Sequence, residues 1–334
     1  MTSERPPIAV LGAGSWGTAL ALQFARSDRK VRLWGRDAAQ LANIAECREN
    51  RKYLPGIPFP DNIQVEADLE SCLGGATDVL IAVPSHAFRE IMTVAMPLLD
   101  EHARVCWATK GFELASGKLP HQVAIEILGA DRPLAVLSGP TFAKEVGEGL
   151  PTAMTIAAND PAFAGELATT LSGDNFRAYT SEDMVGVEVG GAVKNVLAIG
   201  AGISDGLGFG ANTRIALINR GLVEMMRLGV ALGAKADTFM GLAGMGDLVL
   251  TCTDNLSRNR RMGLALASGK TIEEAQEQIR QVVEGVLAAR AVHEVADKLD
   301  VEMPICREIY RILYEGISPR DAVGALMRRG LKPE

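Results

Sequence analysis

The sequence predicts an α/β domain with a mostly parallel sheet, followed by an all-α domain. Up to about residue 180, short β-branched runs alternate with segments of helical spacing, and beyond that point strand-like runs almost disappear. Alternating strands and helices form parallel sheets covered by helices on both faces, because parallel strands need crossover connections. We therefore expect one domain over residues 1–184 and a second, helical domain over residues 185–334.

Six segments of the first part have the length and β-branched content of buried strands. These expected strands are Ile8–Leu11, Val31–Trp34, Val79–Val83, Val105–Ala108, Leu134–Leu137 and Ala153–Ala157. Helical spacing lies between them, for example over residues 17–27 and 86–99. In the second part the expected helices are Val185–Ile203, Thr213–Leu228, Arg260–Ser268, Thr271–Arg280 and Glu284–Leu299.

Composition narrows the class of protein. The 334 residues are 48% hydrophobic and 5% aromatic, with a formal net charge of −7, as in a soluble globular chain. An acidic chain lacks the basic face that nucleic acids and anionic membranes select, so we expect neither as a partner.

The five cysteines include no CxxC pair, which indicates a reduced compartment and no metal site. With no signal-peptide pattern and no apolar run of about 20 residues, we expect a cytoplasmic protein, and a homodimer stays open.

A glycine-rich turn follows the first expected strand. Its sequence is Gly12-Ala13-Gly14-Ser15-Trp16-Gly17, and a helical segment comes directly after it. In this context Gly12 permits a tight turn, Gly14 lets the backbone approach a pyrophosphate, and Gly17 allows close helix packing. The N–H groups at the helix start would face the anion. The turn predicts a dinucleotide site, and a tight turn of some other α/β protein is the alternative.

Arg36 predicts the choice of nicotinamide cofactor. It lies about twenty residues after the glycines, where an NAD-specific site would place a carboxylate on the ribose. A guanidinium there can hold a 2′-phosphate, so we expect NADP(H) to be preferred, with NAD(H) also accepted because Asp37 is adjacent. The alternative is a solvated arginine at a strand end.

Further candidates follow later strands, at the sheet edge where ligands of open α/β sheets bind. Lys110 comes directly after the fourth expected strand and is a candidate for an anionic or carbonyl-bearing substrate. A surface lysine is the alternative. The segment from Gly139 through Thr141 to Ala143 follows the fifth strand, and its small residues would bring the backbone close to a ligand.

Lys194 is the most informative residue of the helical part. It lies among apolar and small residues, and burial of an ammonium is costly unless the group is used or paired. It could extend to solvent or pair with Glu188. If it is instead desolvated beside another cation such as Lys110, its pKa falls and it could deliver a proton.

A basic turn runs from Asn255 to Arg261. Ser257 is a good helix N-cap, and the positive end of the following helix together with Arg258 would receive a phosphate dianion. A basic solvent-facing turn is the alternative.

The absence of GxSxG, HExxH and Walker motifs from the sequence argues against three classes of chemistry. These are acyl transfer, zinc hydrolysis and P-loop chemistry.

Nine blocks of the sequence, taken together, resemble the bacterial-type NAD(P)-dependent glycerol-3-phosphate dehydrogenases. The blocks are, in order, GAGSWGTALA, RKYLPG, VPS, TKGFE, LSGPTFAKEV, GVEVGGAVKNV, DGLGFG, GLAGMGDLVLTCT and NLSRNRRMG. The resemblance covers almost the whole chain. It implies a Rossmann domain followed by a helical domain related to that of 6-phosphogluconate dehydrogenase.

The resemblance also implies a reaction. Dihydroxyacetone phosphate would bind between the domains and be reduced at C2 to sn-glycerol 3-phosphate, for phospholipid synthesis. Lys194 would donate the proton, Lys110 would polarise the carbonyl, and Asp247 would belong to the catalytic group. The implied substrate contacts are Lys110, Gly139, Thr141, Lys194, Asp247, Ser257, Arg258 and Asn259. The implied cofactor contacts beyond the glycines are Ser15, Trp16, Arg36, Tyr53, Lys110, Ala143, Arg258, Val282 and Glu284.

Two departures from the family pattern are mild. Thr141 stands where serine is usual, and Met245 where leucine is usual.

The sequence alone leaves two other functions open. A dehydrogenase of carboxylate-bearing hydroxy acids would leave the Ser-Arg-Asn turn unexplained, and a non-catalytic NADP(H) sensor would not need Lys194.

Overall fold

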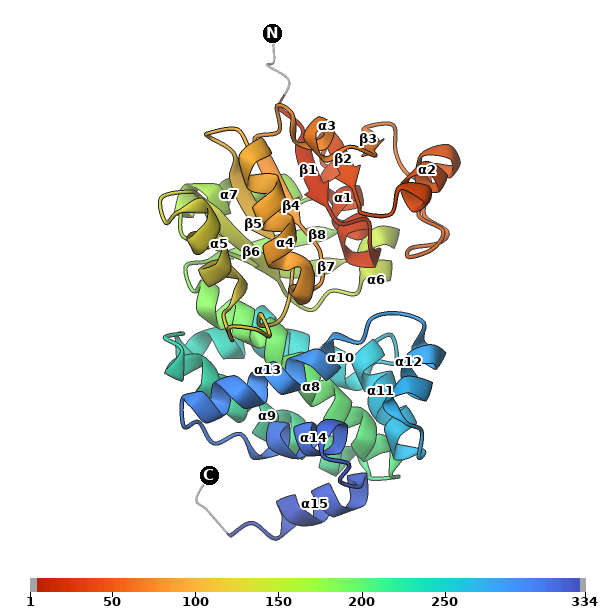
Figure 1. Ribbon diagram of the computed structural model, residues 1–334, viewed down its shortest axis with the longest axis vertical. Coiled ribbons are helices and arrows are strands. Elements are labelled where there is room, and N and C mark those ends of the chain that lie inside the picture. Colours follow the sequence, from red (N-terminus) through yellow and green to blue (C-terminus); the bar gives the residue numbers. More distant parts are fainter. Residues whose placement is uncertain (1–4, 331–334) are drawn as a thin grey trace. The chain divides into compact units, whose positions relative to one another are not determined.

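The computed structural model describes residues 5–330, which form two compact units (Figure 1). The first unit contains the chain up to Lys110 and the segment Pro120–Met184, and the second contains Gly111–Leu119 and the chain from Val185 onward. The short segment Gly111–Leu119 groups with the helical unit because Phe112 and Leu119 are buried in the hydrophobic core of that unit. The sequence pattern does not predict that this segment belongs to the helical unit.

One eight-stranded sheet organises the first unit. Its strands are β1 (Ile8–Leu11), β2 (Val31–Trp34), β3 (Ile63–Glu66), β4 (Asp78–Ile81), β5 (Arg104–Trp107), β6 (Leu134–Ser138), β7 (Thr152–Ala158) and β8 (Phe176–Ser181). Their spatial order is β3-β2-β1-β4-β5-β6-β7-β8, and every neighbouring pair is parallel except β6 with β7. The chain order reverses beside β1, which has β2 on one side and β4 on the other. In doubly wound sheets, ligands bind at such a switch point.

Helices cover both faces of this sheet. The helices of the first unit are α1 (Ser15–Arg26), α2 (Ala38–Cys47), α3 (Leu69–Leu73), α4 (Ser85–Ala95), α5 (Pro120–Leu128), α6 (Ala143–Glu148) and α7 (Pro161–Leu171), with a 3₁₀ turn at Met96–Leu98. Alternate strand residues face opposite sides. Val10 belongs to the core cluster with α1 and α7, while Trp107 meets Phe88 of α4 edge to face on the other side. The expected mostly parallel sheet with two covered faces is confirmed.

The two strands that the sequence did not predict are the two edges of the sheet. In β3 and β8, polar and partly exposed residues interrupt the apolar run, because an edge strand has no neighbour on one side. The inner strands β1 and β4 are buried at every position and produce the continuous apolar signal that sequence analysis detects.

In the part of the second unit that the structure describes, the regular elements are all helices. Its helices are α8 (Met184–Gly206), α9 (Ala211–Ala231), α10 (Asp247–Thr253), α11 (Arg258–Ala267), α12 (Ile272–Ile279), α13 (Glu284–Lys298), α14 (Pro304–Tyr314) and α15 (Pro319–Met327), with a 3₁₀ turn at Ala236–Met240 and a π-helical turn at Leu242–Gly246. Five of the α-helices were predicted, and α10, α14 and α15 were not. Helix α8 is long and apolar enough to span a membrane, but 89% of its apolar window is buried within the protein. It is the central helix of this unit.

A buried carboxylate joins two helices of the second unit. Glu224 of α9 is 3% exposed and accepts hydrogen bonds from the backbone N–H groups of Ile305 (2.7 Å) and Cys306 (3.1 Å), in the first turn of α14. A carboxylate at a helix N-terminus is favourable, but burial disfavours the charge. Burial is the larger effect and raises the pKa of Glu224 to about 7, while the two backbone hydrogen bonds act in the opposite direction.

The raised pKa makes the stability of the protein depend on pH through Glu224. A folded pKa near 7, against an ordinary value of 4.5, means that the folded chain holds the proton more tightly. This stabilisation is complete below pH 4.5 and is lost as pH rises through 7. Relative to Glu224→Gln, the wild type should lose about 3 kcal/mol of unfolding free energy over that range in urea titrations. Parallel pH curves for the two proteins would contradict the assignment.

Candidate active site: cofactor turn and buried lysine

The glycine turn has the backbone geometry expected of a dinucleotide loop. Gly12 has φ +128°, and a Cβ there would lie 2.4 Å from the carbonyl oxygen of Ala82. A Cβ on Gly17 would lie 1.9 Å from the carbonyl oxygen of Gly12. These two glycines are therefore required by the close packing of β1, α1 and the segment after β4.

Gly14 differs from the other two glycines, because a Cβ there would meet nothing within 4 Å. Gly14 is the N-cap of α1, and no side chain caps the helix start. The first N–H groups of a helix have no intrahelical partner, so this end can receive an anion. Nearby, the indole nitrogen of Trp16 is buried without a hydrogen-bond partner within the described chain. Open space beside an uncapped helix start fits the diphosphate of NAD(P).

Arg36 lies just beyond the carboxyl end of β2 and is exposed. Its neighbour Asp37 is the N-cap of α2 and accepts the backbone N–H of Gln40 at 3.0 Å. Asp37 also forms an exposed ion pair with Lys52 at 3.7 Å. The carboxylate of Asp37 thus has structural partners, while the Arg36 guanidinium lies at the surface.

The other first-unit candidates lie after β5 and β6. The Thr109 hydroxyl donates to the carbonyl of Val83 at 2.7 Å and so ties the β5 end, where Lys110 follows, to the β4 end. After β6, a Cβ on Gly139 would lie 2.9 Å from the Cα of Met154 in β7. The Thr141 hydroxyl donates to the Gly139 carbonyl at 3.2 Å. All these groups follow carboxyl ends of parallel strands. Ala143, the first residue of α6, comes two residues after Thr141.

In the second unit, Lys194 is buried, and its side chain is 8% exposed. Its Nζ forms an ion pair with Asp247, which is 1% exposed, and donates to the hydroxyl of Thr251 at 3.2 Å. The sequence suggested Glu188 as an ion-pair partner or Lys110 as a neighbouring cation. Asp247, which pairs with Lys194 here, lies 53 residues along the chain.

Two glycine contacts explain why Lys194 and Asp247 meet. A Cβ on Gly190, one turn before Lys194 in α8, would lie 2.3 Å from the carbonyl oxygen of Ala243. A Cβ on Gly244 would lie 2.2 Å from the carbonyl oxygen of Phe239. The turn Leu242–Gly246 therefore packs backbone to backbone on α8, and it leads directly into Asp247 at the start of α10.

A chain of two amides links α8, α11 and α13. The Nδ2 of Asn259 donates to the Oδ1 of Asn195 at 2.8 Å, and the Oδ1 of Asn259 accepts the backbone N–H of Gly285 at 2.9 Å. Both asparagines are buried. Asn195 follows Lys194, so this bridge fixes the α11 start relative to the buried lysine. Gly285 is next to Glu284, one of the proposed cofactor contacts; Val282, another, is exposed just before α13.

The basic turn at the start of α11 carries arginines in different roles. Ser257 is the N-cap, with its hydroxyl accepting the N–H of Arg260 at 3.2 Å. The guanidinium of Arg260 is paired with Asp205 of α8 at 2.6 Å. Burial and then the charge of Arg258 lower the pKa of Arg261. Arg258 and Arg261 thus repel each other at a helix N-terminus, a positive potential that suits a phosphate dianion.

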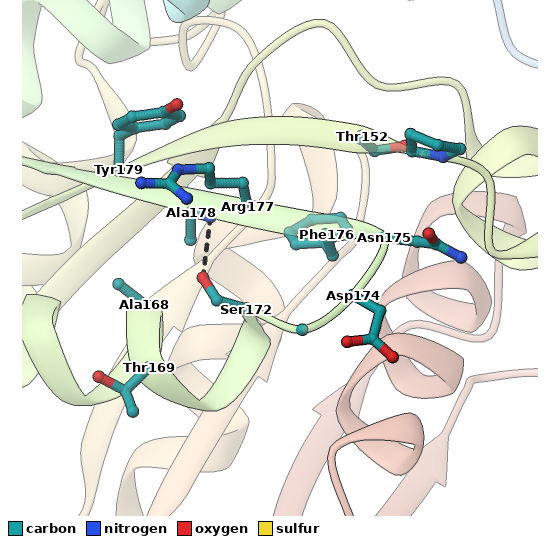
Figure 2. A pocket seen from close by; sticks show the side chains of 12 residues that line it. Thr152, Ala168, Thr169, Ser172, Asp174, Asn175, Phe176, Arg177, Ala178 and Tyr179 are labelled. Carbon is teal, nitrogen blue, oxygen red and sulfur yellow. Dashed lines mark hydrogen bonds between the residues drawn. The ribbon is translucent and has the colours of Figure 1, made fainter.

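A surface hollow of about 540 Å³ lies elsewhere in the first unit, along the edge strand β8 (Figure 2). Figure 2 shows Arg177 and Tyr179 of β8 with Ser172, whose hydroxyl accepts the N–H of Ala178 at 3.1 Å. None of the sequence-predicted site residues lines this hollow. It shares no lining residue with the glycine turn.

Two family models match the chain. Residues 7–164 match the N-terminal domain of NAD-dependent glycerol-3-phosphate dehydrogenase, and residues 183–324 match its C-terminal domain. The chain belongs to this family. It is therefore an oxidoreductase that acts on a CH–OH group with NAD(P), and its reaction interconverts dihydroxyacetone phosphate and glycerol 3-phosphate.

Similar full-length proteins carry the same description. A glycerol-3-phosphate dehydrogenase [NAD(P)+] of Idiomarina loihiensis is 54% identical over 99% of this chain and 100% of its own. That of Bartonella henselae is 55% identical over 97% of this chain and 96% of its own. The crystal structure of the Coxiella burnetii glycerol-3-phosphate dehydrogenase superposes with a TM-score of 0.95, at 49% identity, over 98% of this chain and all of that one.

The sequence did not identify all the polar groups around the buried lysine. Thr251 was missed, although it follows Asp247 by four residues, and its hydroxyl donates back to the Asp247 carbonyl at 2.6 Å. An aspartate and a threonine at this helical spacing in an apolar helix were the available signal. In the first unit, Gln40 and Asn50 contact the glycine turn and were also missed.

Gly190→Ala tests whether backbone packing places Asp247 beside Lys194. The added methyl would overlap the Ala243 carbonyl, so the turn must shift. We expect a loss of about 1–3 kcal/mol of unfolding free energy. Turnover should fall about a hundredfold, because small displacements of catalytic groups are costly.

Gly165→Ala is the matched control, since Gly165 lies within a helix, α7, with nothing within 4 Å of the added methyl. It should keep full turnover and gain a little stability. Equal turnover in the two variants, measured alongside urea unfolding, would exclude the packing argument.

Proposed function

We propose that Lys194 is the proton donor of this dehydrogenase and that Asp247 and Thr251 hold its ammonium group in place. The observation that carries the proposal is the buried ion pair of Lys194 with Asp247. A buried ammonium without a partner would be strongly destabilising, and the carboxylate stabilises its charged, proton-bearing form. The Thr251 hydroxyl accepts a second hydrogen bond from Nζ and so restricts the orientation of the ammonium group.

The proposed reaction is the reduction of dihydroxyacetone phosphate. When bound, NAD(P)H supplies the hydride that reaches C2. The C2 carbonyl becomes an alkoxide as its π electrons move to oxygen, and Lys194 donates the proton that gives the alcohol. The product is sn-glycerol 3-phosphate, a precursor in glycerophospholipid synthesis.

The start of α11 is the proposed site for the substrate phosphate. Ser257 caps the helix, Arg258 begins it, and the neighbouring Arg261 adds positive potential. Because the Arg260 guanidinium is engaged by Asp205, we assign the phosphate to Arg258 and the N-terminal N–H groups. Asn259 then serves both as a substrate contact and as the bridge to Asn195.

The first unit supplies most of the proposed cofactor contacts. Gly12, Gly14 and Gly17 shape the diphosphate loop, with Ser15 and Trp16 at the start of α1. Lys110 would polarise the carbonyl and touch both ligands, while Gly139 and Thr141 approach the substrate through the strand-end backbone. The remaining cofactor contacts that we propose are Tyr53, Ala143, Arg258, Val282 and Glu284.

We propose a preference for NADP(H), with NAD(H) also accepted. The support is the exposed Arg36 after β2 together with the structural roles of Asp37 as an N-cap and an ion-pair partner of Lys52. A carboxylate engaged in this way is less available to a ribose hydroxyl. A guanidinium forms charge-assisted hydrogen bonds with a 2′-phosphate.

The substrate assignment predicts strong discrimination by the phosphate. Absorbance at 340 nm, with NADPH or NADH, should show rapid oxidation with dihydroxyacetone phosphate and far slower oxidation with unphosphorylated dihydroxyacetone. Comparable kcat/KM for the two ketones would contradict a phosphate site at the start of α11.

Lys194→Ala should lose turnover without losing cofactor. We expect kcat to fall by about 10³, within the usual contribution of general acid catalysis. The Kd of NADPH, measured by fluorescence without substrate, should stay within about twofold. A variant that kept its turnover would contradict the role of Lys194 as the proton donor.

Arg36→Ala tests the choice of cofactor. Loss of a charged partner of the 2′-phosphate should raise the KM of NADPH by about tenfold or more. The KM of NADH should change little, since NADH has no 2′-phosphate. Equal losses for both cofactors in steady-state assays would reject this role.

A further inference from the structure

The peptide between Ala13 and Gly14 is held by two side chains from outside the glycine motif. The carbonyl oxygen of Ala13 accepts the Nε2 of Gln40 at 2.9 Å and the Nδ2 of Asn50 at 3.0 Å. A carbonyl oxygen has two lone pairs, and both are engaged here. Gln40 comes from α2, and Asn50 from the loop between α2 and β3.

We propose that Asn50 and Gln40 are positioning residues that orient the Gly14 N–H toward the cofactor diphosphate. The C=O and N–H of a trans peptide point in opposite directions, and the described chain contains no cis peptide. Holding the Ala13 carbonyl on the side of Asn50 and Gln40 therefore turns the Gly14 N–H to the opposite side. This inference rests on the proposed cofactor role of the glycine turn.

Asn50 is well suited to this role because both polar atoms of its side chain have partners, in the loop, the turn or α1. It is fully buried, and its Nδ2 also donates to the hydroxyl of Thr18 in α1 at 2.8 Å. Its Oδ1 accepts the N–H of Tyr53 at 3.3 Å. The Ser15 hydroxyl in turn donates to the Tyr53 carbonyl at 2.8 Å. Hydrogen bonds from Asn50 to the turn and from Ser15 to the loop thus join the two segments.

The loop that carries Asn50 is itself anchored. Glu49 accepts the N–H of Gly56 at 2.7 Å, which lowers the pKa of this carboxyl group and closes the loop. Leu54, Ile57 and Phe59 are buried in the hydrophobic core of the first unit. A rigid loop can hold a hydrogen-bond donor against the glycine turn before the cofactor arrives, so less ordering is needed on binding.

Gln40→Met and Asn50→Ala test the proposal through equilibrium binding of NADPH and NADH, with no substrate present. Methionine keeps the length of glutamine but cannot donate a hydrogen bond. We expect Kd to rise about fivefold in Gln40→Met and about tenfold or more in Asn50→Ala. The rise should be similar for the two cofactors, because both carry the same diphosphate.

Gln23→Met is the matched control. Gln23 lies in α1, is buried, and donates its Nε2 to the Leu171 carbonyl at 2.9 Å, a partner outside the glycine turn. The same chemical change there should lower stability in urea titrations and leave Kd unchanged. If Gln23→Met weakened NADPH as much as Gln40→Met, a general loss of stability would explain the effect and the proposal would fail.

Two fragments of the cofactor sharpen the test. ADP-ribose contains the diphosphate and adenosine 2′-monophosphate does not, so Gln40→Met should weaken only ADP-ribose. Equal weakening of both fragments, or unchanged Kd in both variants, would overturn the proposal. Because Gln40 is only partly buried, its variant remains informative even if Asn50→Ala fails to fold.

The binding assay also separates this inference from the proposed function. If the Kd pattern holds but dihydroxyacetone phosphate is not reduced, the roles of Asn50 and Gln40 stand and the substrate assignment fails. If turnover is normal and the Kd pattern is absent, the proposed function stands and the two positioning roles are wrong.

Discussion

A charged amine buried among apolar helices must have a partner, and in this protein that partner is Asp247. Removing either member of such a pair would leave an uncompensated buried charge, at about 3–5 kcal/mol. The constraint extends outward from the pair. Asp247 can reach Lys194 only because α8 and the π-helical turn approach backbone to backbone at Gly190 and Gly244. These two glycines therefore place the charged groups of the pair through packing.

Each of the two units contains a helix start of the same electrostatic character. At the start of α1 and again at the start of α11, backbone N–H groups without intrahelical partners create a positive end. The first lies beside open space at Gly14, and the second begins with Arg258. A nucleotide diphosphate and a small phosphorylated ketone are the anions that this family brings together.

The sequence was sufficient for structure that depends on local backbone. The strand, glycine turn and helix at the start of the chain were predicted in succession and are confirmed, while the cofactor roles of the glycines stay a prediction. The inner strands and the long helix carrying Lys194 were also predicted, because buried elements leave continuous apolar signals. The edge strands β3 and β8 were not, since exposure on one side makes their sequences resemble loops.

Contacts between distant segments do not follow from local sequence patterns, and only the family resemblance grouped Asp247 with Lys194. Asp247 lies 53 residues from Lys194, and Asn259 of α11 lies 64 residues from Asn195. Asn50 gives no periodic signal, because its loop is irregular and its importance arises only where it meets the Ala13 carbonyl. Each of these contacts depends on how helices and loops pack against one another. Local patterns in a single sequence do not reveal that packing.

Chemical rescue of Lys194→Ala is the most direct measurement of whether this residue delivers a proton. Truncation leaves a cavity beside the Asp247 carboxylate that a small cation can enter. Methylammonium and ethylammonium carry a transferable proton and should restore turnover, whereas tetramethylammonium, which has none, should not. Equal rescue by tetramethylammonium would show that only the positive charge matters, and would contradict the account of Lys194 as the acid.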